Sequence, residues 1–125
     1  MTQRPFDEWQ ASQRFPRRAR IRSTKDILAL LRHGRRLEAG AIDLYLRENT
    51  VGRPRVGIIV PKHGHPNVER NRLKRRIRET VRRGWLARRW REGASIDLLV
   101  RARPSAYDLS AADLIARLGE ALREW

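Results

Sequence analysis

The sequence predicts one α+β domain over residues 14–125, a two-layer sandwich in which helices cover one face of a small mixed sheet. Three observations lead to this class. Apolar residues recur at helical spacing in three segments, they alternate or cluster in three short strand-like segments, and the two kinds of segment are interleaved. The predicted order is helix, strand, strand, helix, strand, helix. Residues 1–13 show no usable periodicity, and we expect them to form an N-terminal extension outside the domain.

The first and the last helix are both marked by capping boxes. Ser23 stands three residues before Asp26, Ser110 stands three residues before Asp113, and an apolar run at helical spacing follows each pair. In this arrangement the serine hydroxyl accepts a hydrogen bond from a free backbone N–H group in the first turn. Gly34 is placed to end the first helix. Short amphipathic helices are therefore predicted to begin near residues 23 and 110.

Three segments are predicted to be strands. Residues 41–47 alternate between apolar and polar side chains, so one face should be buried while Tyr45 points to the opposite, exposed face. Residues 55–60 are rich in β-branched side chains, and residues 96–101 are mostly apolar. The turn at 49–54 contains Gly and Pro, and it predicts antiparallel pairing of the first two strands.

The middle helix is predicted over residues 67–84. Asn67 is expected to cap it, and Glu69 lies in the first turn, where the helix dipole favours a carboxylate. Because this helix connects the second and third strands, those strands are parallel if they are neighbours, and such crossovers are normally right-handed. The buried stripe of the helix consists of Leu73, Ile77 and Val81.

The charge of the chain points to an anionic partner. Lys and Arg total 29 against 14 Asp and Glu, a net charge of +15 over 125 residues. An excess of this size is typical of nucleic-acid-binding proteins. Most residues from Arg70 to Glu79 are Arg or Lys, and they flank the buried stripe of the middle helix on both sides. One guanidinium group can bind two phosphate oxygens at once, so we interpret this helix as a polyanion-binding element. The alternative is a solvated charged face without a ligand.

Several other function classes lack the residues that they need. The chain has no cysteine, which excludes disulfides, thiolate metal sites and cysteine nucleophiles. No apolar run is long enough to span a bilayer, and residues 1–13 lack the apolar core of a signal peptide, so a cytoplasmic location is expected.

Metal sites are also not expected. Asp43 and Asp97 could in principle form a two-metal nuclease centre, but no third carboxylate is placed to complete it. His63 and His65 likewise have no further ligand close in sequence. Contact of these histidines with phosphate, or with nothing, is favoured over a metal pair.

The order of elements and the basic helix resemble the protein subunit of bacterial ribonuclease P. The family's signature helix stands here as the segment Arg70 to Glu79, with the sequence Arg-Asn-Arg-Leu-Lys-Arg-Arg-Ile-Arg-Glu. Val56 to Lys62 resembles the family's central strand and the lysine that follows it. Ala19 to Ile21 and Ala102 to Pro104 resemble further family segments in the same order. The similarity covers residues 14–123.

This resemblance implies a noncatalytic subunit of an endoribonuclease. The family pairs with a large catalytic RNA that removes the 5′ leader from precursor tRNA, with Mg2+ ions that are bound mainly by the RNA. The expected partners are therefore the RNA subunit and precursor tRNA, with no membrane, and the expected complex contains one protein monomer per RNA. No cofactor is expected to bind tightly to the protein itself. The family's crossover is left-handed, so a left-handed crossover is expected here.

The resemblance also implies roles for particular residues, none of them catalytic. The leader is expected to lie in a cleft between the first helix, the sheet and one flank of the middle helix. The residues expected to contact the leader are Tyr45, Ile27, Leu31, Lys62, Asn71, Lys74 and Arg78. The residues expected to contact the RNA subunit are Arg20, Arg70, Arg72, Arg75 and Arg76.

Stacking on leader bases is expected to depend mainly on one ring. Ile27 and Leu31 stand where the family commonly has aromatic side chains, so this role falls to Tyr45. The alternative for Tyr45 is ordinary packing beneath the first helix, and for Ile27 and Leu31 it is packing in the core.

Two other functions are compatible with parts of this pattern. A ribosomal or general structured-RNA-binding protein would use the same basic helix without any processing reaction. An autonomous metal nuclease would instead depend on Asp43 and Asp97.

Overall fold

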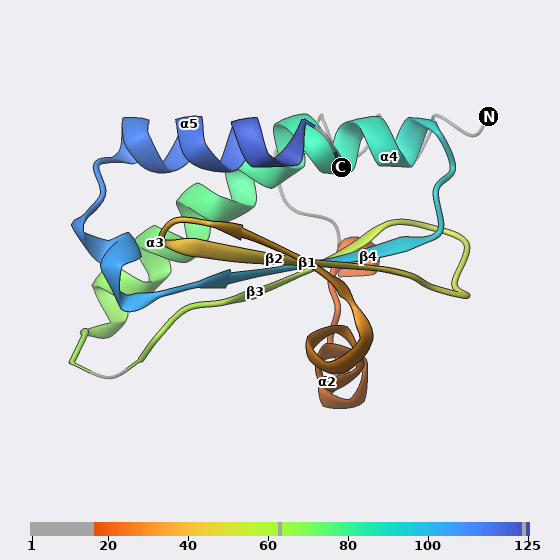
Figure 1. Ribbon diagram of the computed structural model, residues 1–125, viewed down its shortest axis with the longest axis horizontal. Coiled ribbons are helices and arrows are strands. Elements are labelled where there is room, and N and C mark those ends of the chain that lie inside the picture. Colours follow the sequence, from red (N-terminus) through yellow and green to blue (C-terminus); the bar gives the residue numbers. More distant parts are fainter. Residues whose placement is uncertain (1–16, 63, 124) are drawn as a thin grey trace.

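The computed structural model describes residues 17–62, 64–123 and 125, and its centre is a four-stranded mixed sheet (Figure 1). The strand order is β1-β2-β4-β3. The strands are β1 (Arg35–Ala39), β2 (Ile42–Glu48), β3 (Arg55–Ile59) and β4 (Ile96–Ala102). The three predicted strands are thus present within one or two residues of their expected ends, and the prediction of an α+β fold with a small mixed sheet is confirmed. The expected extension at residues 1–13 lies outside the described part.

Helices lie on both faces of this sheet (Figure 1). One face is covered by α3 (Asn67–Val81) and α5 (Ala111–Leu122), as predicted, and also by the short α4 (Ala87–Arg91), which is not predicted by the sequence. The other face is crossed by α2 (Thr24–His33), which the expectation of helices on one face did not include. The remaining short segments are η1 (Arg17–Ala19), η2 (Arg82–Leu86) and η3 (Pro104–Asp108).

The serine cap of each predicted capping box is present. The Ser23 hydroxyl accepts from the Asp26 N–H at 3.4 Å, and the Ser110 hydroxyl accepts from the Asp113 N–H at 3.1 Å. Gly34 follows the last residue of α2, and its N–H donates to the carbonyl of Leu30. These local signals therefore fix where α2 and α5 begin and where α2 ends.

The strand β1 is not predicted by the sequence, so the order is helix, strand, strand, strand, helix, strand, helix. It pairs antiparallel with β2, from Arg35 opposite Leu46 to Ala39 opposite Ile42. Gly40 turns the chain between the two strands with a φ of +68°, a conformation that favours glycine. Because β1 is an edge strand, it needs few apolar residues, and its charged sequence gives no alternating pattern to detect.

The strand β2 is buried on both faces, which corrects the prediction for Tyr45. Ile42 and Leu44 belong to the main core between the sheet and the three-helix layer. Tyr45 belongs to a second, smaller core beneath α2 and is only 5% exposed. The expectation of an exposed ring is wrong because α2 covers this face, and the alternative of packing beneath the first helix is correct.

The pairing predicted for the turn at 49–54 is also wrong. The strands β2 and β3 are not neighbours, because β4 lies between them, antiparallel to β2 and parallel to β3. Leu98, Leu99 and Val100 make β4 the most deeply buried strand, with no exposed surface on any of the three. A strand of this composition is stabilised most in the centre of a sheet.

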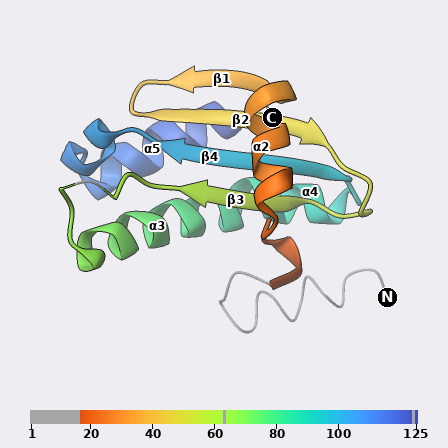
Figure 2. The same cartoon turned by 90° about the horizontal axis from the view of Figure 1, so that it is seen from below.

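The crossover from β3 through α3 to β4 joins parallel strands, as predicted, and it is left-handed. With the helix layer facing the viewer and both strands pointing up, β4 lies to the left of β3 (Figures 1 and 2). This hand is opposite to the usual rule. The expectation drawn from the family resemblance is therefore confirmed.

The basic helix differs from its prediction at both ends. Pro66 occupies the capping position, and Asn67 is the first helical residue, so the predicted cap by Asn67 is wrong. Gly84 does not end the helix, because the chain continues through the π-helical turn η2 into α4. Trp85 and Leu86 are buried at 1% and 0% exposure. The π turn shifts the helical phase, so these two side chains continue the buried face of α3.

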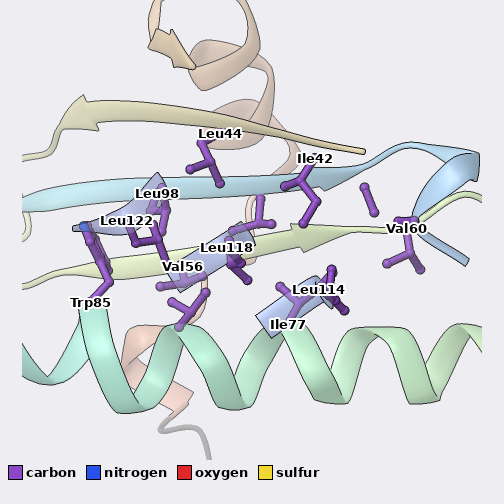
Figure 3. Packing of buried hydrophobic residues seen from close by; sticks show 14 of the residues in the cluster. Ile42, Leu44, Val56, Val60, Ile77, Trp85, Leu98, Leu114, Leu118 and Leu122 are labelled. Atoms are coloured by element: carbon purple, nitrogen blue, oxygen red, sulfur yellow. The ribbon is translucent and has the colours of Figure 1, made fainter. Parts of the chain in front are cut away.

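The main core lies between the sheet and α3 and α5 (Figure 3). Ile77 from α3 and Leu114 and Leu118 from α5 meet side chains from the central strands. Trp125 is also buried, at 4% exposure, and the Arg35 guanidinium lies 5.5 Å from the centre of its ring. Apolar packing thus fixes α3 on the sheet by one narrow stripe and leaves both of its flanks for other contacts.

Candidate nucleic-acid interface

The cations of α3 between residues 70 and 78 form no ion pair within the described part of the chain. The two nearest acids are occupied by other side chains. Glu69 is bound by the His65 ring at 2.9 Å. Glu79 is bound by Arg82 at 2.9 Å and by Arg83 at 3.3 Å. The cations left without an acidic partner are Arg70, Arg72, Lys74, Arg75, Arg76 and Arg78.

One flank of α3 faces a cleft at the outer edge of β3. The cleft has a volume of about 160 Å³, and Arg20, Lys74 and Arg78 supply its charged groups. Its apolar lining comes from Ile21, Val56, Gly57 and Ile58. The Ile21 N–H donates to the Val56 carbonyl at 3.0 Å, which attaches the segment before α2 to the edge of the sheet. This attachment brings Arg20 to the side of the cleft opposite α3.

The electrostatics of this cleft favour an anion. The pKa of Arg78 is lowered by burial first, and then by the neighbouring positive charges of Arg20 and Arg75. Three like charges held near one another raise the free energy of the unoccupied cleft, and an anionic ligand would relieve that repulsion. Gly57 lines the cleft without a side chain, because a Cβ atom at this position would lie 3.2 Å from Leu99 Cδ1 and 3.6 Å from Ile21 Cβ.

The other flank of α3 faces the loop after β4. Arg72 and Arg76 line a second cavity there, together with His65 and Tyr107. Burial raises the pKa of the Tyr107 phenol, and the nearby positive charge of Arg70 opposes this shift. The buried Nε atom of Arg70 has no hydrogen-bond partner. The predicted division of the α3 cations between two flanks is therefore present in the structure.

The residues expected to contact a leader do not all come together. Lys74 and Arg78 share the cleft at the β3 edge, while Asn71 is exposed one turn earlier on α3 and Lys62 is exposed in the loop before the helix. Tyr45 lies under α2, with the Arg36 guanidinium 5.8 Å from its ring centre. Ile27 and Leu31 are half-buried against the same small core.

The sequence groups Arg20 with the RNA-subunit contacts, but the structure places it beside Lys74 and Arg78. The β-bridge between Arg20 and Val56 holds Arg20 in this place. Local sequence patterns do not predict such a long-range contact. The candidate interface is therefore wider than one helix and includes the segment before α2.

Asp43 and Asp97 have structural partners. Asp43 accepts from Arg103 at 2.8 Å, and Asp97 accepts from Arg55 at 2.7 Å and from Asn49 at 2.7 Å. These carboxylates raise the pKa values of Arg103 and Arg55, mainly through the hydrogen bonds.

The two aspartates are also far apart. Asp43 pairs with Arg101 of β4, which stands four positions after Asp97 on the same strand. At the rise of a β-strand this separation is roughly 13 Å, which is too far for a shared two-metal centre.

His65 has partners other than a metal. Its Nδ1 atom lies 2.9 Å from Glu69 Oε2, and its ring stacks on Tyr107 with the ring centres 3.7 Å apart. His63 lies outside the described residues. No group of three or more His, Asp or Glu side chains able to hold a metal ion occurs in the part of the chain that the structure describes.

Across residues 17–62, 64–123 and 125, no helix combines the length and apolar character needed to cross a membrane.

Comparisons with known proteins agree on one family. A family model described as ribonuclease P matches residues 15–125. The ribonuclease P protein component of Acidothermus cellulolyticus is 36% identical over 109 residues, covering 86% of this chain and 88% of that protein. The protein of the same name from Syntrophobacter fumaroxidans is 34% identical over 107 residues, covering 86% of this chain and 87% of that protein.

Solved structures show the same fold. The ribonuclease P protein of Staphylococcus aureus superposes with a TM-score of 0.69 at 24% identity, covering 85% of this chain and 93% of that one. The Thermotoga maritima protein superposes with a TM-score of 0.68 at 24% identity, covering 85% and 96%. The family model, the curated relatives and the shared fold together assign the chain, which belongs to the ribonuclease P protein family.

Proposed function

We propose that this chain is the protein subunit of ribonuclease P and that it binds both the catalytic RNA subunit and the 5′ leader of precursor tRNA. Membership of the family supports the subunit role. The observation that carries the binding proposal is the row of α3 cations without acidic partners, on both flanks of one helix. A surface of this kind binds phosphates, and each phosphate contact releases counterions from the RNA.

The cleft at the β3 edge is the candidate leader site. Arg20, Lys74 and Arg78 would contact phosphates of a single strand, while the apolar lining would contact sugars and bases. Asn71 is exposed one turn before Lys74 and extends this flank of α3. A site of this type needs an unpaired strand, so it would distinguish precursor tRNA from mature tRNA, which has no leader.

The other flank of α3 is the candidate RNA-subunit surface. Arg72 and Arg76 point away from the leader cleft, so one helix can contact two parts of a ribonucleoprotein at once. The proposed complex contains one protein monomer for each RNA molecule.

In the proposed reaction the chain neutralises phosphate charges of the RNA and positions the leader of precursor tRNA. The buried carboxylates Asp43 and Asp97 are held by Arg side chains, so they do not fit a Mg2+ site of the protein's own. We therefore assign the Mg2+ ions and the hydrolysis of the phosphodiester bond to the RNA subunit. Neutralising phosphate repulsion would let the RNA work at lower magnesium concentration.

Reconstitution tests this proposal. The purified chain is added to a ribonuclease P RNA subunit at low Mg2+, and release of the 5′ leader from precursor tRNA is followed. Stimulation is expected, together with no cleavage by the chain alone. A chain with Arg117→Ala, which removes one exposed positive charge from α5, serves as the matched control and should stimulate normally. Absence of stimulation would reject the subunit role and favour a general RNA-binding protein.

A further inference from the structure

The cavity on the second flank of α3 has the features of a binding site of its own. It has a volume of about 280 Å³ and lies between α3 and η3 (Pro104–Asp108). It shares no lining residue with the leader cleft, whose charged groups lie on the opposite flank of the helix. Its lining combines aromatic, cationic and anionic side chains, whereas the leader cleft has only cations and apolar groups.

The aromatic part of this cavity is held by contacts on each ring. The rings of His65 and Tyr107 are stacked, with centres 3.7 Å apart and planes inclined by 11°. Each ring is also held at its edge, since the Tyr107 hydroxyl donates to the Pro61 carbonyl at 2.6 Å and His65 Nδ1 lies 2.9 Å from Glu69 Oε2. A fixed stack of this kind offers a preformed apolar surface to a third planar group.

The charged part of the cavity has free groups of both signs. Arg72 and Arg76 are one helical turn apart and form no ion pair with any described residue. Asp108 is exposed at the same cavity, and it too has no partner among the described residues. The cations and the carboxylate lie on different elements, α3 and η3, and do not neutralise one another.

We propose that this cavity binds one unpaired ribonucleotide of the partner RNA. The phosphate is held by Arg72 and Arg76, the base packs against the His65 and Tyr107 rings, and Asp108 accepts a hydrogen bond from the ribose 2′-hydroxyl. A simple anion would leave the carboxylate beside negative charge, and a deoxyribonucleotide lacks the 2′-hydroxyl. The lining of the cavity therefore favours a ribonucleotide over a simple anion or a deoxyribonucleotide. This proposal rests on the proposed function only in taking RNA as the partner.

Binding of a short oligonucleotide by the full chain tests the site without any ribozyme. The probe is 5′-phosphorylated triuridylate, and backbone amide shifts are followed by NMR. The expected result is a set of shifts concentrated at His65, Arg76 and Tyr107, with weaker binding of the 2′-deoxy trinucleotide. Shifts confined to Arg20, Lys74 and Arg78, or equal shifts with inorganic phosphate, would overturn the proposal.

Two surface variants sharpen this test. Arg76→Gln and Asp108→Asn should each weaken triuridylate binding about tenfold, the typical effect of one lost charge-assisted hydrogen bond. Arg117→Gln removes an exposed charge from α5, outside both cavities, and should leave triuridylate binding unchanged. Unchanged binding by both pocket variants would overturn the assignment.

The test is independent of the proposed function. If reconstitution fails while triuridylate still binds between α3 and η3, the subunit role is rejected and the nucleotide site stands. If reconstitution succeeds while the trinucleotide avoids the cavity, the nucleotide site alone is rejected.

Discussion

Arg82 donates from both Nε and Nη2 to the two carboxylate oxygens of Glu79, at 3.2 and 2.9 Å. Arg82 is nearly buried, at 8% exposure, so this ion pair is part of the folded structure rather than of the RNA-binding surface. The pair occupies the acid that follows the basic segment of α3. It therefore keeps the Glu79 carboxylate from pairing with Arg75, which lies one turn before it on the helix.

This pair predicts a loss of stability in acid. The pKa of Glu79 is lowered, first by the hydrogen bond from Arg82 and then by the charges of Arg82 and Arg83. A carboxyl group with a lowered pKa stabilises the fold above its unfolded pKa, and this contribution disappears as the pH falls through the folded pKa. Urea unfolding of the wild type and of Glu79→Gln should converge at low pH and separate near neutrality. A constant difference at all pH values would contradict this account.

Arg72→Ala should weaken binding to the RNA subunit and reduce the slope of log affinity against log salt by about 0.7–0.9, the value for one lost phosphate contact. The physical reason is that Arg72 is exposed on the flank of α3 away from the leader cleft and has no acidic partner among the described residues. The control is Arg117→Ala on α5, for which the slope should not change. An unchanged slope for Arg72→Ala would remove this residue from the interface.

Arg78→Ala should instead reduce the preference for precursor over mature tRNA. Its guanidinium lies in the leader cleft with Arg20 and Lys74, and only precursor tRNA has a strand to place there. A charge-assisted hydrogen bond to phosphate is worth roughly 1.5–3 kcal/mol, so precursor affinity should fall by that amount while mature tRNA binding stays nearly constant. Affinities of the holoenzyme for the two tRNA forms provide the measurement. Equal losses for both forms would place Arg78 outside the leader site.

Tyr45→Ala should act through folding. The ring is buried beneath α2 with Leu30 and Leu99, and truncation of a buried aromatic side chain costs about 3–5 kcal/mol of unfolding free energy. Tyr45→Phe keeps the ring and should be close to neutral. The unfolding free energies of both variants are compared by denaturant unfolding. Leader binding is then measured for each variant that stays folded. A stable Tyr45→Ala protein that has lost only leader binding would restore the idea of direct contact.

Asp97→Ala should also cost stability and leave the chemistry unaffected. The mutation removes the closer acidic partner of Arg55, whose side chain is only 14% exposed, and leaves it the more exposed Asp26 at 3.4 Å. Loss of one partner of a buried ion pair costs roughly 3–5 kcal/mol, and Asp26 should keep the cost near the lower end of that range. Cleavage by the reconstituted holoenzyme should be retained at temperatures where the variant is folded. Complete loss of cleavage by a folded Asp97→Ala protein would instead support the metal-nuclease alternative.

Local sequence signals predict the local structure well. The serine caps of α2 and α5, the three apolar strands and the buried stripe of α3 all follow from spacing within a few residues. The two-flank arrangement of the α3 cations follows from the same spacing, because helical geometry fixes which side chains share a flank.

The features that the sequence does not reveal depend on contacts between distant residues. The edge strand β1 is specified by its pairing with β2 and not by its own composition. Burial of Tyr45 depends on where α2 packs, and the π turn after α3 depends on where Trp85 fits into the core. Tertiary packing decides these points, and local pattern cannot supply it.

The position of β4 in the centre of the sheet has a consequence for biosynthesis. The strand that joins β2 to β3 is β4, which is made after the whole basic helix. A nascent chain that has emerged only as far as residue 95 can form the β1 and β2 hairpin but no larger sheet. Completion of the sheet must therefore wait until residues 96–102 have emerged, and an emerging α3 remains a charged, unsupported segment until then.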